Sequence, residues 1–135
     1  MTLDDLLLDL GLTLARDDTG AYNSARPPYP LPAVGTLYAV TQVTGDTPKT
    51  QLHGGRQDRT RLILISVYGS PDTAAGRRQL DIVMAHLRVR AKEIDRHLGI
   101  RVRECRAADA TPDQRDAPTN TRYAHQRIAL DYLSP

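Results

Sequence analysis

Apolar residues recur over the first fourteen positions at the spacing of an amphipathic helix. Thr2 can cap this helix, and Asp4 and Asp5 fall in its first turn, where the helix dipole favours negative charge. Leu8 and Leu12 lie away from the main apolar stripe, so we expect both to face a neighbour. The stripe itself consists of Leu3, Leu6, Leu7, Leu10 and Leu14.

Two runs rich in β-branched residues predict the first two strands. Residues 36–44 (TLYAVTQVT) alternate in polarity, whereas residues 60–68 (TRLILISVY) are apolar on both faces. The polar stretch 45–59 between them is longer than a tight hairpin needs, so we expect it to form a projecting interaction arm. Its candidate contact residues are His53, Arg56 and Arg59.

A proline-rich segment precedes these strands. Residues 26–32 (RPPYPLP) hold four prolines in seven positions, which favours an extended polyproline conformation. Such segments commonly form an extended wall packed on their own domain, and more rarely the ligand of a proline-binding domain. We expect the first role here.

A long amphipathic helix is predicted over residues 72–98. The corner before it is explained by geometry, because Gly69 can relax the backbone where the strand ends. Ser70 or Asp72 can cap the helix, and Pro71 suits its first turn. The core-facing stripe consists of Leu80, Val83, Met84, Leu87, Ala91, Ile94 and Leu98.

The remaining elements complete an α-β-β-α-β-β order. Gly99 can end the helix, and residues 100–105 and 122–133 predict two further strands. We therefore expect a single domain over residues 1–135 of the α+β class, with a mixed or antiparallel four-stranded sheet under two helices. On the last strand, one face carries Ala124, Ile128, Leu130 and Tyr132, and the other carries His125, Arg127 and Asp131.

The polar stretch 107–121 between the last two strands is a second candidate arm. Like the first arm, it is expected to contact a partner rather than to belong to the sheet. Its candidate contact residues are Asp113, Arg115 and Asp116.

The amino-acid composition is that of a single globular domain and argues against some functions. The 135 residues suffice for one domain, and the core must be aliphatic with six tyrosines, since Phe and Trp are absent. A net charge of only +2 argues against a dedicated DNA-binding protein. The single Cys105 cannot form an intramolecular disulfide, and no signal peptide is visible, so we expect folding in the cytoplasm.

The sequence indicates no set of residues that could form a catalytic, phosphate-binding or metal-binding site. The glycine corner at Gly69 lacks the Lys-Ser/Thr pair of a phosphate-binding loop, and His53 is not followed by a nucleophile elbow. His86 and His97 would stand roughly 16 Å apart along a helix, too far to bind one metal ion. We therefore expect no catalytic residue, metal or cofactor.

The sequence contains several apolar residues that do not belong to the predicted core stripes. Ile82, Ala85 and Val89 lie opposite the core stripe of the long helix, and the pattern favours subunit contacts over isolated exposed aliphatics. The candidate interface residues are Leu8, Leu12, Ile82 and Val89.

Three stretches resemble the tail terminator (neck) proteins of contractile-tailed bacteriophages and related contractile particles. They read RLILISVYGSPDTAAGRRQLDIVMAHL, LGIRVRECRAADATPD and RYAHQRIALDYL. In that family a strand ending in Tyr-Gly leads into a long helix, a Gly-Ile pair introduces the next strand, and an arginine-containing strand ends the domain. The resemblance covers residues 27–133 and departs from the family in lacking Trp and Phe. The matching positions are Tyr68, Gly69, Gly99, Ile100, Arg122, Arg127 and Asp131.

The resemblance implies a structural virion protein without enzymatic activity. Six subunits would form a ring that caps the tail tube, ends tail elongation and joins the tail to the head connector. The implied partners are tube, sheath and connector proteins, with genomic DNA passing through the lumen without sequence-specific binding. The resemblance also implies that the protein is located in the tail neck of a virion, which is assembled in the host cytoplasm without membrane association.

Other interpretations stay open at this point. One is a head-completion or tail-completion connector protein, and another is an enzyme using His53 or His125, for which no nucleophile is indicated. A third is a nucleic-acid-binding adaptor. Its candidate residues are Arg56, Arg59 and Arg61, or Arg88, Arg90, Arg101 and Arg103.

Overall fold

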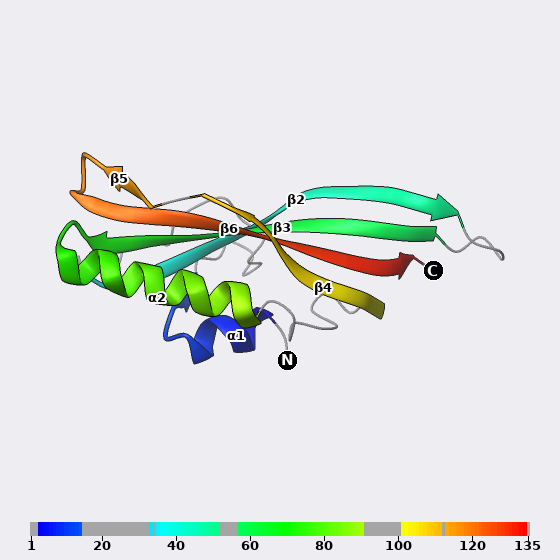
Figure 1. Ribbon diagram of the computed structural model, residues 1–135, viewed down its shortest axis with the longest axis horizontal. Coiled ribbons are helices and arrows are strands. Elements are labelled where there is room, and N and C mark those ends of the chain that lie inside the picture. Colours follow the sequence, from blue (N-terminus) through cyan, green and yellow to red (C-terminus); the bar gives the residue numbers. More distant parts are fainter. Residues whose placement is uncertain are drawn as a thin grey trace.

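In its described residues the chain forms one mixed sheet with two helices on one of its faces (Figure 1). The computed structural model describes residues 3–14, 33, 35–51, 57–90, 101–111 and 113–134. The helices are α1 (Leu3–Asp9) and α2 (Ala74–Arg90). The strands are β1 (Thr13–Leu14), β2 (Tyr38–Gln51), β3 (Gln57–Pro71), β4 (Arg101–Ala110), β5 (Gln114–Asp116) and β6 (Thr121–Ser134).

The strands run in the order β1-β2-β3-β6-β4, and β5 pairs with β6. Each of these pairings is antiparallel except that of β1 with β2. The predicted α+β class with a mixed sheet is therefore confirmed. The four predicted strands correspond to β2, β3, β4 and β6, and the short strands β1 and β5 come in addition.

The core lies between the helices and the middle of the sheet. Period-2 alternation along β3 points Ile63, Ile65 and Val67 toward α2, and every one of them is buried. From α2 the buried side chains come at helical spacing, as predicted, and α1 adds two leucines. These helical residues are Leu80, Val83, Met84, Leu87, Leu6 and Leu7.

The first helix is shorter than predicted, and Leu12 is not outward-facing. Gly11 adopts a φ of 72°, and its amide donates to Leu8 O at 2.9 Å while the Leu12 amide donates to Leu7 O at 3.0 Å. This pair of bonds is the Schellman arrangement, in which a left-handed residue ends a helix. It folds Leu12 back onto Leu7, so that Leu12 is only 3% exposed and belongs to the core.

The first candidate arm is largely sheet rather than loop. Strand β2 continues to Gln51 and β3 begins at Gln57, and their pairing runs from Tyr38↔Tyr68 to Gln51↔Gln57. Irregularities between Val43 and Gly45, and between Pro48 and Thr50, interrupt β2. The hairpin extends beyond both helices, so the projection was predicted correctly and its conformation was not (Figure 1).

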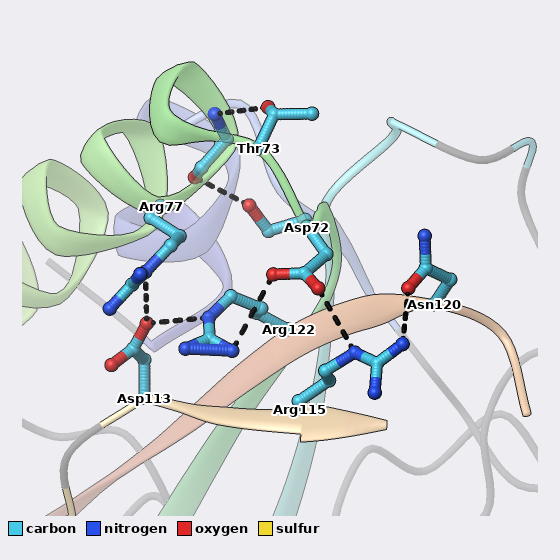
Figure 2. A network of polar contacts seen from close by, with 9 residues as sticks. Asp72, Thr73, Arg77, Asp113, Arg115, Asn120 and Arg122 are labelled. Atoms are coloured by element: carbon cyan, nitrogen blue, oxygen red, sulfur yellow. Dashed lines mark hydrogen bonds and ion pairs between the residues drawn. The ribbon is translucent and has the colours of Figure 1, made fainter. Parts of the chain in front are cut away.

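The second candidate arm also contains paired strands. Strand β4 continues through residues 107–110, which had been assigned to the arm, and β5 pairs with the start of β6. Only residues 117–120 form a turn, and Asn120 there has a φ of 53°. The short hairpin places Asp113 and Arg115 beside the corner between β3 and α2 (Figure 2), and it pairs Asp116 with Thr121 of β6.

At that corner two glycines permit close backbone contacts. A Cβ on Gly69, whose φ is 90°, would lie 2.4 Å from Thr36 O, and a Cβ on Gly76 would meet the Pro71 carbonyl oxygen. The helix cap is Thr73 rather than Ser70 or Asp72, because the Gly76 amide donates to Thr73 Oγ1 at 3.1 Å. Pro71 ends β3 instead of starting the helix.

We expect Gly69→Ala to lower the free energy of unfolding by about 3 kcal/mol, since it combines a left-handed backbone with a steric clash. Gly11→Ala is the matched control, because its φ is 72° and nothing lies within 4 Å of its Cβ. The control is expected to cost about 1 kcal/mol. Urea denaturation measures both, and equal losses would show that the contact with Thr36 does not constrain the corner.

Candidate interaction surfaces

Ion pairs join the β3–α2 corner to the strands around β5. Asp72 Oδ1 lies 3.5 Å from Arg122 Nη1, and Asp72 Oδ2 accepts from Arg115 Nε at 3.0 Å (Figure 2). Arg122 Nε also donates to Asp113 Oδ2 at 2.9 Å. Arg122 therefore bridges the two carboxylates, and residues far apart in the sequence meet in one cluster.

Two further contacts extend this cluster towards its rim. Arg77 Nε of α2 lies 3.4 Å from Asp113 Oδ2, and Arg115 Nη2 donates to Asn120 Oδ1 at 2.8 Å. We call Asp72, Arg77, Asp113, Arg115, Asn120 and Arg122 the corner network. Exposed ion pairs contribute little to stability, so its energetic centre is Arg122, which is largely buried, rather than the half-exposed Arg77 and Arg115.

The electrostatics of the corner network favour a structural role. The hydrogen bond from Arg122 holds the pKa of Asp113 below its usual value, against the opposing effect of burial, and the charges of Arg122 and Arg77 add to this. A carboxylate kept ionised and bound to guanidinium groups is poorly suited to accept or deliver a proton. The network positions the β5 hairpin against α2.

The outer side of the helical layer carries exposed aliphatic side chains. Ile82 and Val89 of α2 are 51% and 70% exposed, and Leu8 of α1 is 64% exposed. Ile82 and Val89 are two turns apart and lie on one side of α2, as the sequence predicts. An ion pair between Arg90 and Asp9 joins the adjacent ends of the two helices. Leu12 is excluded from this surface by its burial.

The other predicted site residues are spread along the sheet. Arg59 lies in β3 opposite Tyr132 of β6, and Asp131 accepts a 2.6 Å hydrogen bond from Thr60. Arg127 of β6 is half-buried opposite Leu64. His53, Arg56 and Gly99 lie outside the described residues, as does His97.

A row of aromatic rings occupies the sheet face opposite the helices. Tyr68 of β3 stacks with Tyr38 of β2 and with Tyr123 of β6, at centroid distances of 5.5 and 5.3 Å. His125 packs edge-on against Tyr68 and Tyr123, and its Nδ1 lies 2.6 Å from Ser66 Oγ. We call these five residues the aromatic face. The aromatic face was not predicted from the sequence, although the spacing of Tyr123 and His125 puts both side chains on one side of a strand.

The described part of the chain gathers no group of three or more His, Cys, Asp or Glu side chains able to hold a metal ion. Within the same residues, neither helix has the length and apolar character needed to cross a bilayer. Ser66 and His125 form a hydroxyl–imidazole pair. Burial lowers the pKa of His125, and its ring packs edge-on against Tyr68 and Tyr123.

The corner network predicts a pH-dependent stability. The folded-state pKa of Asp113 is lowered, so its contribution is fully present at neutral pH and is lost as the pH falls from about 5 through the folded-state pKa. We therefore expect Asp113→Asn to be less stable than the wild type at pH 7, with a difference that shrinks toward pH 3.

Urea midpoints at several pH values measure this effect. The control is Asp81→Asn, which changes an exposed aspartate of α2 outside the corner network and should leave the midpoints close to those of the wild type. A difference between Asp113→Asn and the wild type that stays constant from neutral to acidic pH would contradict the role given to Asp113.

Comparison with known proteins gives a likeness of fold. No family model and no curated protein matches the sequence. Among solved structures, a chain of the "Virion of native gene transfer agent (GTA) particle" superposes with a TM-score of 0.54 at 16% sequence identity. The match covers 98% of this chain and 87% of that chain. The whole chain therefore shares the fold of a protein found in a virion particle.

Proposed function

We propose that this chain is a structural protein of a phage-like virion, and specifically a tail terminator or neck protein. The observation that carries the proposal is the likeness of fold to a virion chain over 98% of the length. The sequence resemblance to tail terminators over residues 27–133 supports the finer assignment. In this role a homohexameric ring caps the tail tube, ends its elongation and joins the tail to the head connector.

Ring formation requires each subunit to present two different, complementary surfaces. In a closed heterologous assembly, one face of a subunit packs on another face of the next. The exposed side chains of Ile82 and Val89 on α2, with Leu8 on α1, supply one apolar candidate surface. Burying them between subunits would remove from water the large aliphatic side chains that the described fold leaves exposed.

The β2–β3 hairpin and the β5 hairpin are the candidate contacts with tube, sheath and connector proteins. Both extend from the sheet, and the first projects beyond the helices (Figure 1). The corner network holds the β5 hairpin against α2 and so fixes its direction. In the assembled neck, genomic DNA passes through the lumen without base-specific contacts.

We expect the purified protein to form an assembly larger than a monomer, measured as mass by light scattering. Changing Ile82 and Val89 to Asp places charges in the proposed contact, so the mass is expected to fall to that of a single chain. Arg88→Asp is the control, because this exposed residue of α2 lies roughly 100° around the helix from Val89, on the flank of the apolar side. Circular dichroism checks that the variants fold.

Two outcomes decide the place of the interface. An assembly that persists in the Ile82 and Val89 variant would exclude the outer side of α2 as the subunit contact. A monomer in wild type and variant alike, also after addition of purified tail tubes, would contradict the terminator assignment.

Charge reversal in the residues that connect β2 to β3 in the sequence is expected to leave the fold intact and to prevent head–tail joining. Arg56→Glu is the test, since Arg56 lies between the two strands of that hairpin. Arg88→Glu is the matched control, because Arg88 is exposed but lies roughly 100° around α2 from Val89, away from the proposed subunit contact. Electron microscopy counts joined particles, and normal joining by Arg56→Glu would overturn the role of this hairpin.

The same assay separates a terminator from a connector protein. Loss of a terminator gives tails of uncontrolled length, whereas loss of a head-completion protein leaves tails of normal length that fail to join. Tail lengths in particles lacking this chain therefore decide between the two structural roles.

A further inference from the structure

The aromatic face is partly removed from water although both described helices lie on the other side of the sheet (Figure 1). Its neighbour Val40 on β2 is only 6% exposed and does not belong to the helix-side core, and Ser66 is 5% exposed. Neighbours within a sheet cover the flanks of such side chains, but not their outward ends, because side chains stand roughly perpendicular to the sheet. Tyr38, Tyr68, Tyr123 and His125 are themselves only partly exposed, and together these exposures indicate that another part of the chain covers this face.

Titration behaviour agrees with the removal from water. Burial lowers the pKa of His125, and burial, with smaller effects of Tyr68 and Asp116, raises the pKa of Tyr38. Among the described residues, the groups that act on these rings are Ser66, the other tyrosines and Asp116. None of these groups places an apolar side chain over the outward side of the aromatic face.

The chemistry of the face fits an extended proline-rich segment. A polyproline helix makes no internal hydrogen bonds, so its carbonyl groups stay free to accept from tyrosine hydroxyls. Its pyrrolidine rings pack on aromatic rings, and its preformed shape limits the entropy lost on docking. Three tyrosines in a stacked row, from three neighbouring strands, offer both kinds of contact.

The chain supplies such a segment beside this face. Leu14 pairs with Ala39, next to Tyr38, before the stretch 15–32 that lies outside the described residues. The chain returns in a turn closed by a 3.0 Å hydrogen bond from the Thr36 amide to Ala33 O. Thr36 O packs on Gly69, the neighbour of Tyr68. Both ends of the stretch are thus anchored next to the tyrosine row.

We propose that the aromatic face is the docking surface of the proline-rich segment 26–32 of the same chain. Seven residues in a polyproline helix span roughly 22 Å, enough to cross a row of three rings that begins beside the anchored turn. The segment acts as the apolar cover of the sheet face that the helices leave open. The inference goes beyond the proposed virion role and does not depend on it.

Nuclear magnetic resonance on the full chain, labelled on tyrosine and proline side chains, tests this directly. We expect nuclear Overhauser contacts from the rings of Tyr68 and Tyr123 to prolines of the 26–32 segment. Pro30→Ser is expected to weaken them and to shift the Tyr68 ring signals. The matched control is Pro118→Ser, which makes the same change in the exposed turn after β5 and should leave those signals in place.

A double-mutant cycle gives an independent measurement. Pro30→Ser and Tyr68→Leu are combined, with Tyr123→Leu as the second ring variant in case Tyr68→Leu fails to fold. If ring and proline touch, the unfolding constant of the double variant departs roughly threefold or more from the product of the single effects. The pair Pro118→Ser with Tyr68→Leu should show no such departure.

Each outcome decides the proposal. Ring–proline contacts within one chain, with coupling in the cycle, support it. Absence of both overturns it. Contacts found only between differently labelled copies of the chain would also overturn it, since the segment would then dock on a neighbouring subunit.

Discussion

The alignment of β3 with its two neighbours is the constraint on which the rest of the structure depends. Strand β3 pairs with β2 on one edge and with β6 on the other, along almost its whole length. Because side chains alternate between faces, a slip of one residue would move Ile63, Ile65 and Val67 away from the helices. The same register brings Ser66 opposite His125, so one alignment sets both the core and the aromatic face.

The contacts at the end of β3 determine where α2 begins and in which direction it runs. The register shifts between Val67 and Ser70, and the chain turns into α2 within a few residues. Close backbone contacts at Gly69 and the buried bridge of Arg122 hold this turn. The direction of α2, and with it the direction of its exposed aliphatic side, therefore follows from contacts made at one end of the sheet.

Local periodicity predicted which elements exist, and contacts across the sheet decided how far they extend. The apolar spacing identified α2 and the central strands, because those segments alternate against a core. Residues 46–51 of the distal hairpin (DTPKTQ) pair with β3, but they contain no apolar alternation that would mark them as a strand. The end of α1 was readable in principle from Gly11, whose left-handed conformation turns Leu12 inward.

The corner network could not be predicted from the sequence, because its residues come together only in the folded chain. Asp72 and Arg122 lie in stretches of the chain that are remote from each other, and only the β3–β6 pairing brings them within 3.5 Å. Each residue taken alone is one charged side chain among many. The aromatic face has the same origin, since its rings come from three strands that meet only in the folded sheet.

The irregular outer edge of β2 bears on whether a strand of a second chain can pair with it. Among the described strands, β1 pairs with this edge only at Tyr38 and Ala39, which leaves a long run of backbone without a strand partner. Pro48 and the two interruptions break that run. An edge so broken cannot template the continuous strand addition that leads to fibres.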